Sequence, residues 1–158
     1  MSLIDAAMVV VHQLFAALWV GGVVFVALAV LPLARDGTLD PDTLDTIVDR
    51  FVTLSRTSAF FLLVSGSHLI GNWYTGEVIT DLSPLYTTGR GHLVLTMVVS
   101  WVVLAALVEI SSSRLRDGLD RGKLREPARD ALPWYRGAAL VAVLVTLVAG
   151  LLSAGIAV

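Results

Sequence analysis

The sequence predicts an all-α fold: a polytopic membrane protein, a four-transmembrane-helix bundle that forms one domain over residues 1–158. Of the 158 residues, 56% are hydrophobic and only 15% are charged, which is too apolar for the surface that a soluble domain of this size exposes to water. The chain has no cysteine, so disulfide scaffolds, thiolate metal sites and cysteine nucleophiles are excluded. The few charged residues separate four long apolar runs, and these runs predict the fold class.

Each apolar run is long enough for one membrane crossing, because a helix needs about 20 mainly apolar residues to cross a hydrocarbon core of roughly 30 Å. Lipid offers backbone amides no hydrogen-bond partner, and none of the runs alternates like a barrel strand, so helices are expected. The expected spans are about 6–33, 57–75, 91–113 and 135–157.

The first run is expected to be a retained span, since no Lys or Arg precedes it and it is longer than a signal peptide core. Pro32 lies near its end, where a helix can stop. Asp40 followed by Pro41 is typical of a helix N-terminus, so a cytoplasmic amphipathic helix is predicted over about 41–56, running into the second span. After the third span, the glycines and prolines of 114–136 predict a short helical extension and then a turn.

The cations predict the orientation. Ten of the eleven Lys and Arg residues lie between the first and second or the third and fourth spans, and Arg90 alone lies on the other side. By the positive-inside rule, both termini are therefore extracytoplasmic. Acidic residues interspersed with the second cationic group favour contact with the lipid bilayer over nucleic acid. Small residues spaced four apart on the first and fourth spans make a homo-oligomer plausible.

The three histidines of the chain, His12, His68 and His92, are the main candidate site residues. The predicted topology places all three in the outer half of the membrane, on three different helices. Imidazoles from separate helices at one depth are what a metal or haem site needs, so these three are predicted to bind a metal ion or cofactor.

Neighbouring residues suit two cofactors. Met8 precedes His12 by one helical turn, and a thioether beside an imidazole suits a copper ion, Cu(I) in particular. Arg90 lies at the outer boundary beside His92, where it could bind a haem propionate. The alternative is structural: a histidine can bridge two helices by a hydrogen bond, and Glu109 is expected to pair with Arg114, Arg116 or Arg136.

The first span also resembles a known family. Its segment 12–22, HQLFAALWVGG, followed by Leu31-Pro32, resembles the opening span of the copper-resistance D (CopD) family of bacterial and archaeal membrane proteins. It is less closely similar to the HemJ type of protoporphyrinogen oxidase, a four-span haem b protein. The resemblance implies the plasma membrane of a prokaryote.

Three hypotheses follow from the residues and the resemblance. The first is copper handling or transport through His12, His68, His92 and Met8 on the outer side. The second is a membrane redox protein with haem b held by two histidines, which would make the chain a haem-dependent oxidoreductase. The third is a cofactor-free accessory membrane subunit; whether the protein is an enzyme stays open, with the non-enzymatic hypotheses preferred.

Overall fold

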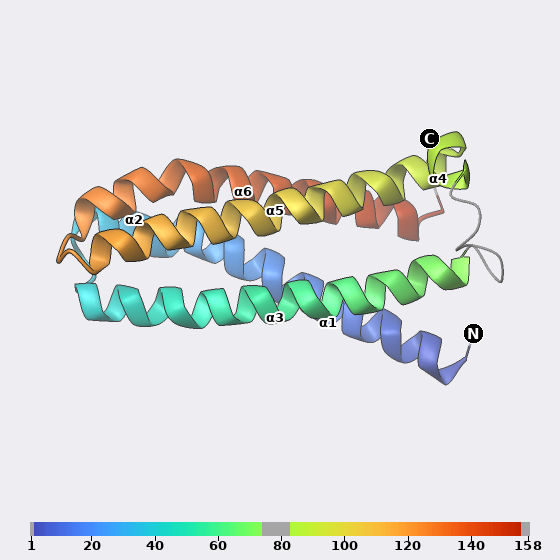
Figure 1. Ribbon diagram of the computed structural model, residues 1–158, viewed down its shortest axis with the longest axis horizontal. Helices are drawn as coiled ribbons and strands as arrows, with labels where there is room; N and C mark the ends of the chain where they lie inside the picture. The colour runs from blue at the N-terminus through green and yellow to red at the C-terminus, as the bar shows by residue number, and fades with distance from the viewer. Residues whose placement is uncertain (1, 74–82, 156–158) are drawn as a thin grey trace.

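The computed structural model describes residues 2–73 and 83–155, and every regular element in these two ranges is a helix, which confirms the all-α prediction (Figure 1). In chain order the elements are α1 (Leu3–Phe25), η1 (Val26–Val30), α2 (Leu31–Asp36), α3 (Pro41–Trp73), α4 (Ser83–Thr87), α5 (Gly89–Leu119) and α6 (Arg125–Ser153).

The long helices pack as two antiparallel pairs. α1 lies along α3, α5 lies along α6, and α3 also contacts α5, while α2 packs against α6 (Figure 1). The start of α1, α4 and the end of α6 lie at one end of the bundle, and the α2–α3 and α5–α6 connections lie at the other (Figure 1). One continuous cluster of buried apolar side chains joins α1, η1, α2, α3, α5 and α6.

The first helical stretch, which runs from α1 through η1 to α2, begins at a capping box. The Ser2 hydroxyl accepts from the Asp5 amide at 3.1 Å, and the Asp5 carboxylate accepts from the Ser2 amide at 2.8 Å. The stretch continues through the π-helical turn η1 into α2. Pro32 explains that turn, since a proline ring clashes with the carbonyl four residues earlier, and a widened turn moves the Leu28 carbonyl away.

The predicted amphipathic helix and the second predicted span form a single helix, α3. Its start is capped as expected: the Thr43 amide donates to an Asp40 carboxylate oxygen at 2.9 Å. The Thr43 hydroxyl, and then this amide, hold the pKa of Asp40 below its ordinary value. Leu44 and Val48 in the first half of α3 are buried, so this segment belongs to the bundle core.

The predicted extension of the third helix and the turn after it are confirmed. α5 continues to Leu119, and Gly122 in the turn has φ 70°. α6 begins at Arg125, well before the predicted fourth span, and it contains two prolines. Pro127 lies in the first turn of α6, where amides have no intrahelical partner, whereas Pro133 removes one bond from the helix interior.

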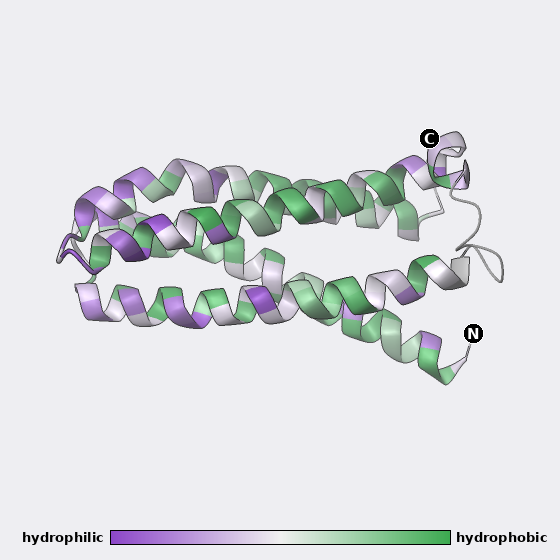
Figure 2. Ribbon diagram, viewed as in Figure 1, coloured by the Kyte–Doolittle hydropathy of each residue, from purple (hydrophilic) through white to green (hydrophobic). Residues whose placement is uncertain are grey.

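Three helical stretches among the described residues are long and apolar enough to cross a membrane: Leu3–Asp36, Gly89–Leu119 and Arg125–Ser153. By helix hydropathy the chain is thus a candidate multi-pass membrane protein. The expected second span falls in the second half of α3, where serines and a histidine lower the hydropathy, and its last two residues lie outside the described ranges. Figure 2 shows hydrophilic residues gathered at the end of the bundle that carries the two short connections.

Glu109 does pair with an arginine, but the predicted partners were wrong. Arg56 of α3 donates to both carboxylate oxygens of Glu109, with an Nε–Oε2 distance of 3.2 Å. Arg116 pairs instead with Asp49 of α3. The antiparallel packing of α3 on α5 brings these side chains together across 53 and 67 positions of sequence. Helical spacing along α5 alone does not reveal these pairs.

Candidate functional site

Two of the three predicted histidines lie at one helix interface. His12 of α1 and His68 of α3 each make a hydrogen bond across the contact between these helices. His92 lies on the first turn of α5, exposed, and its Nε2 donates to the Tyr86 carbonyl oxygen at 2.8 Å. The described residues contain no group of three or more His, Cys, Asp or Glu side chains placed to hold a metal ion.

The hydrogen bonds of Ser65 determine which nitrogen of His12 carries the proton. The Ser65 hydroxyl donates its single proton to the Phe61 carbonyl oxygen at 2.6 Å, so towards His12 it can only accept. His12 Nδ1 lies 3.0 Å from this oxygen and must therefore be the donor. In the neutral imidazole, the lone pair is then on Nε2, which is the nitrogen available to a metal ion.

The Asp5 carboxylate determines which nitrogen of His68 carries the proton. Its Nε2 lies 3.1 Å from an Asp5 carboxylate oxygen, which can only accept, so Nε2 donates and the lone pair of the neutral ring is on Nδ1. Asp5 is held in turn by the α1 capping box, because its other carboxylate oxygen accepts from the Ser2 amide. A carboxylate that orients an imidazole is a common arrangement behind metal-ligating histidines.

The two histidine contacts lie about one helical turn apart on α3 and about two turns apart on α1. Ser65 and His68 are three residues apart on α3 and therefore neighbours on one face, about 5–6 Å between Cβ atoms. On α1, Met8 follows Asp5 by three residues and precedes His12 by four, so it begins on the same face between the two levels. Met8 is half-buried. Helical spacing thus puts the Met8 thioether on the α1 face that makes both contacts.

Gly66 leaves room for His12. A Cβ at this position would lie 3.3 Å from His12 Cε1, closer than most side chains tolerate. The His12 ring therefore occupies the space that the missing Gly66 side chain leaves at this interface. Ser67 points elsewhere: it is exposed and donates to the Leu63 carbonyl oxygen at 2.7 Å.

The polar contacts continue along the same interface away from the histidines. Trp19, seven residues after His12, donates from Nε1 to the buried Ser55 hydroxyl at 2.6 Å. Ser58, one turn from Ser55 on α3, is 0% exposed, and its hydroxyl has no hydrogen-bond partner within 2–73 and 83–155. We call the set Asp5, His12, Trp19, Ser55, Ser58, Ser65 and His68 the α1–α3 polar seam.

Sequence reasoning identified the two histidines of the seam but not the α3 serines. Helical spacing places Asp5, His12 and Trp19 on one face of α1, and their contacts with α3 agree with this. Ser55, Ser58 and Ser65 were not identified as partners. Their spacing of three and seven residues puts them on one helix face and was the available signal. Arg90, expected near a haem propionate, is exposed on the first turn of α5.

No family model, curated protein or solved structure matches this chain.

Proposed function

We propose that the protein is an integral membrane protein that binds a copper ion at the outer half of the α1–α3 polar seam, as part of copper handling or transport. One observation carries the proposal: imidazoles from α1 and α3 meet at one interface with their proton-bearing nitrogens turned to acceptors, and the ring lone pair of His12 lies on Nε2. Metal-binding histidines are typically oriented in this way.

The donor set fits copper. His12 and His68 supply imidazole, which binds copper well, and Met8 supplies a thioether, which favours Cu(I) over harder ions. Asp5 acts as the positioning residue for His68, and Ser65 as the positioning residue for His12. Copper is the cargo of this site, and the residues on the two helices bind and orient it.

The proposal includes the membrane topology. α3 becomes the second of four spans, because it lies along α1 over much of its length and its second half carries the seam. Both termini are then extracytoplasmic, and the basic connections face the cytoplasm of a prokaryotic cell. The copper site opens towards the outer side of the plasma membrane.

The test is to purify the protein in mild detergent and to measure its absorption spectrum together with its copper, iron and zinc content. We expect about one copper per chain, lost in His12→Ala and His68→Ala and retained in His92→Ala, the matched control at the same end of the bundle. A sharp Soret band with iron would contradict the proposal in favour of haem b. Copper content that is equal in all three variants would contradict the assignment of the ligands.

A further inference from the structure

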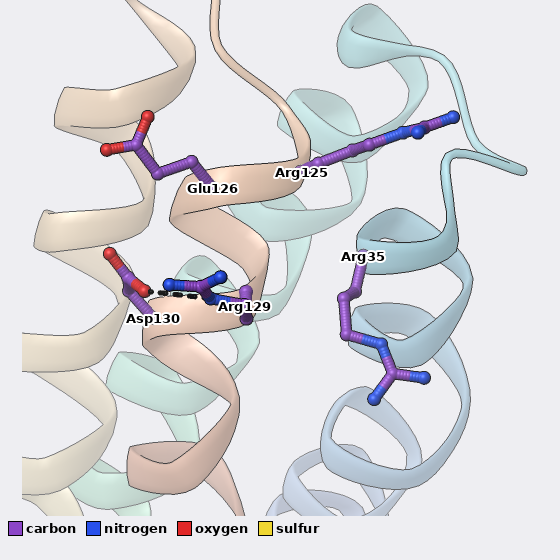
Figure 3. Close-up of a pocket in the computed structure, with 5 residues that line it drawn as sticks. All are labelled: Arg35, Arg125, Glu126, Arg129 and Asp130. Atoms are coloured by element: carbon purple, nitrogen blue, oxygen red, sulfur yellow. Dashed lines mark ion pairs between the residues drawn. The ribbon is translucent and has the colours of Figure 1, made fainter.

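A second site lies at the opposite end of the bundle from the histidines. A pocket of about 450 Å³ opens between the end of α2 and the first turns of α6 (Figure 3). Its lining is entirely charged: Arg35, Arg125, Glu126, Arg129 and Asp130. Figure 3 shows Arg35 and Arg125 on the α2 side, with the carboxylates of Glu126 and Asp130 directed away from them.

The acidic residues of the pocket have cationic partners of their own. Glu126 pairs with Lys123 at 2.8 Å, and Asp130 lies 3.6 Å from Arg129. Arg35 bonds its neighbour Asp36 at 2.8 Å through Nε alone, which leaves its other guanidinium donors for a ligand. Arg125 makes no ion pair within the part of the chain that the structure describes.

Gly37 leaves room for the Arg125 guanidinium. The residue ends α2 with φ 77°, and a Cβ there would lie 2.4 Å from Nη2 of Arg125. The guanidinium therefore lies directly over the α2–α3 turn, in a place that only glycine leaves open. The Arg125 side chain thus reaches from α6 across to the end of α2 (Figure 3).

Exposed apolar side chains continue from the pocket towards the membrane-spanning part of the helices. On the first helical stretch, Leu28 precedes Arg35 by about two helical turns and is 65% exposed. On α6, Leu140 follows Arg129 by eleven residues, which places both on one face, and it is 74% exposed. The site therefore has guanidinium groups at its polar end and leucines at its apolar end.

We propose that this pocket binds the phosphate of an anionic phospholipid, with the acyl chains lying along the exposed leucines. Guanidinium groups donate paired hydrogen bonds that match phosphate oxygens, and basic pockets between transmembrane helices are suited to anionic lipid headgroups. A soluble phosphate would use only the arginines, whereas a phospholipid matches both the charge and the leucines. The proposal does not depend on the copper site.

The test is to incubate the purified protein with phosphatidylglycerol or phosphatidylcholine in mild detergent and to count retained lipids by native mass spectrometry. We expect phosphatidylglycerol to be retained about tenfold more than phosphatidylcholine, and this preference to disappear in Arg35→Gln with Arg125→Gln. The control Arg50→Gln, matched to the single variant Arg125→Gln, removes one charge from an exposed position elsewhere and keeps the preference. The single variant Arg125→Gln, at an exposed position, shows a partial loss and provides the test should the double variant misfold.

Two outcomes would overturn the proposal. In the first, the pocket variants retain phosphatidylglycerol as well as the control does. In the second, inorganic phosphate displaces the lipid completely, which would show that the arginines bind phosphate without the leucines. Retention of phosphatidylglycerol in the presence of inorganic phosphate, lost in the pocket variants alone, supports the lipid site.

Discussion

At the scale of single residues, the direction of one hydrogen bond decides what His12 can do. Ser65 gives its proton to the backbone of its own helix and so presents only an acceptor to His12 Nδ1. A serine that donated to His12 instead would leave the lone pair on Nδ1, turned into the helix contact. Ser65 is thus a positioning residue, which acts on a ligand through the tautomer of that ligand.

Replacing Ser65 by alanine should weaken copper binding about 10–100-fold, because the His12 ring loses the acceptor that sets its tautomer and orientation. A copper titration against a competing chelator measures this change. Ser67→Ala is the matched control, since Ser67 lies two positions away, faces outward and bonds only its own helix.

Ser65→Thr keeps a hydroxyl and should recover part of the lost affinity. A simple packing role for Ser65 predicts otherwise: the alanine variant would bind copper as tightly as the wild type, and only its stability would change. That result would remove Ser65 from the site.

At the scale of helices, α1 and α3 are joined by a series of polar contacts set in apolar surroundings. The Trp19–Ser55 hydrogen bond is fully buried, and the stacked rings of Phe15 and Phe61, with centroids 4.4 Å apart, lie between it and the histidines. A buried N–H donor without an acceptor costs about 1–3 kcal/mol. Removing one partner of this hydrogen bond therefore destabilises the protein by more than the intact bond stabilises it.

Ser55→Ala should lower the free energy of unfolding by about 1–3 kcal/mol, because the Trp19 indole N–H remains buried without an acceptor. Trp19→Phe should also destabilise the protein, and the double variant should lose less than the sum of the two changes. Unfolding in mixed micelles, followed by circular dichroism, gives the three values. Strictly additive losses would mean that the two side chains are not coupled.

At the scale of the whole molecule, composition and charge were enough to predict an all-α bundle, helix boundaries near Pro41 and the position of most loops. These features depend on local signals: apolar run length, an Asp-Pro cap and glycine turns. The partners of Glu109 and His12 depend on which faces of α1, α3 and α5 meet. Helical spacing places residues on a face but does not say which neighbour that face contacts, so Arg56 and Ser65 were not predicted.

The proposed topology makes a direct prediction, because a chain without cysteine can be labelled at single introduced cysteines. In intact cells, Ser83→Cys should react with a membrane-impermeant maleimide, whereas Thr38→Cys and Lys123→Cys should react only after the membrane is opened. Ser83 and Thr38 lie beyond opposite ends of α3. Labelling of both in intact cells would mean that α3 does not cross the membrane.

The central claim is that a copper ion is held by the imidazoles of α1 and α3. X-ray absorption at the copper edge of the purified, copper-loaded protein tests it most directly, since the fine structure reports the type and number of ligands. The account predicts two imidazole nitrogens together with one sulfur, with one imidazole lost in His12→Ala and none lost in His92→Ala. Copper bound only by oxygen ligands, or a spectrum that is unchanged in His12→Ala, would contradict it.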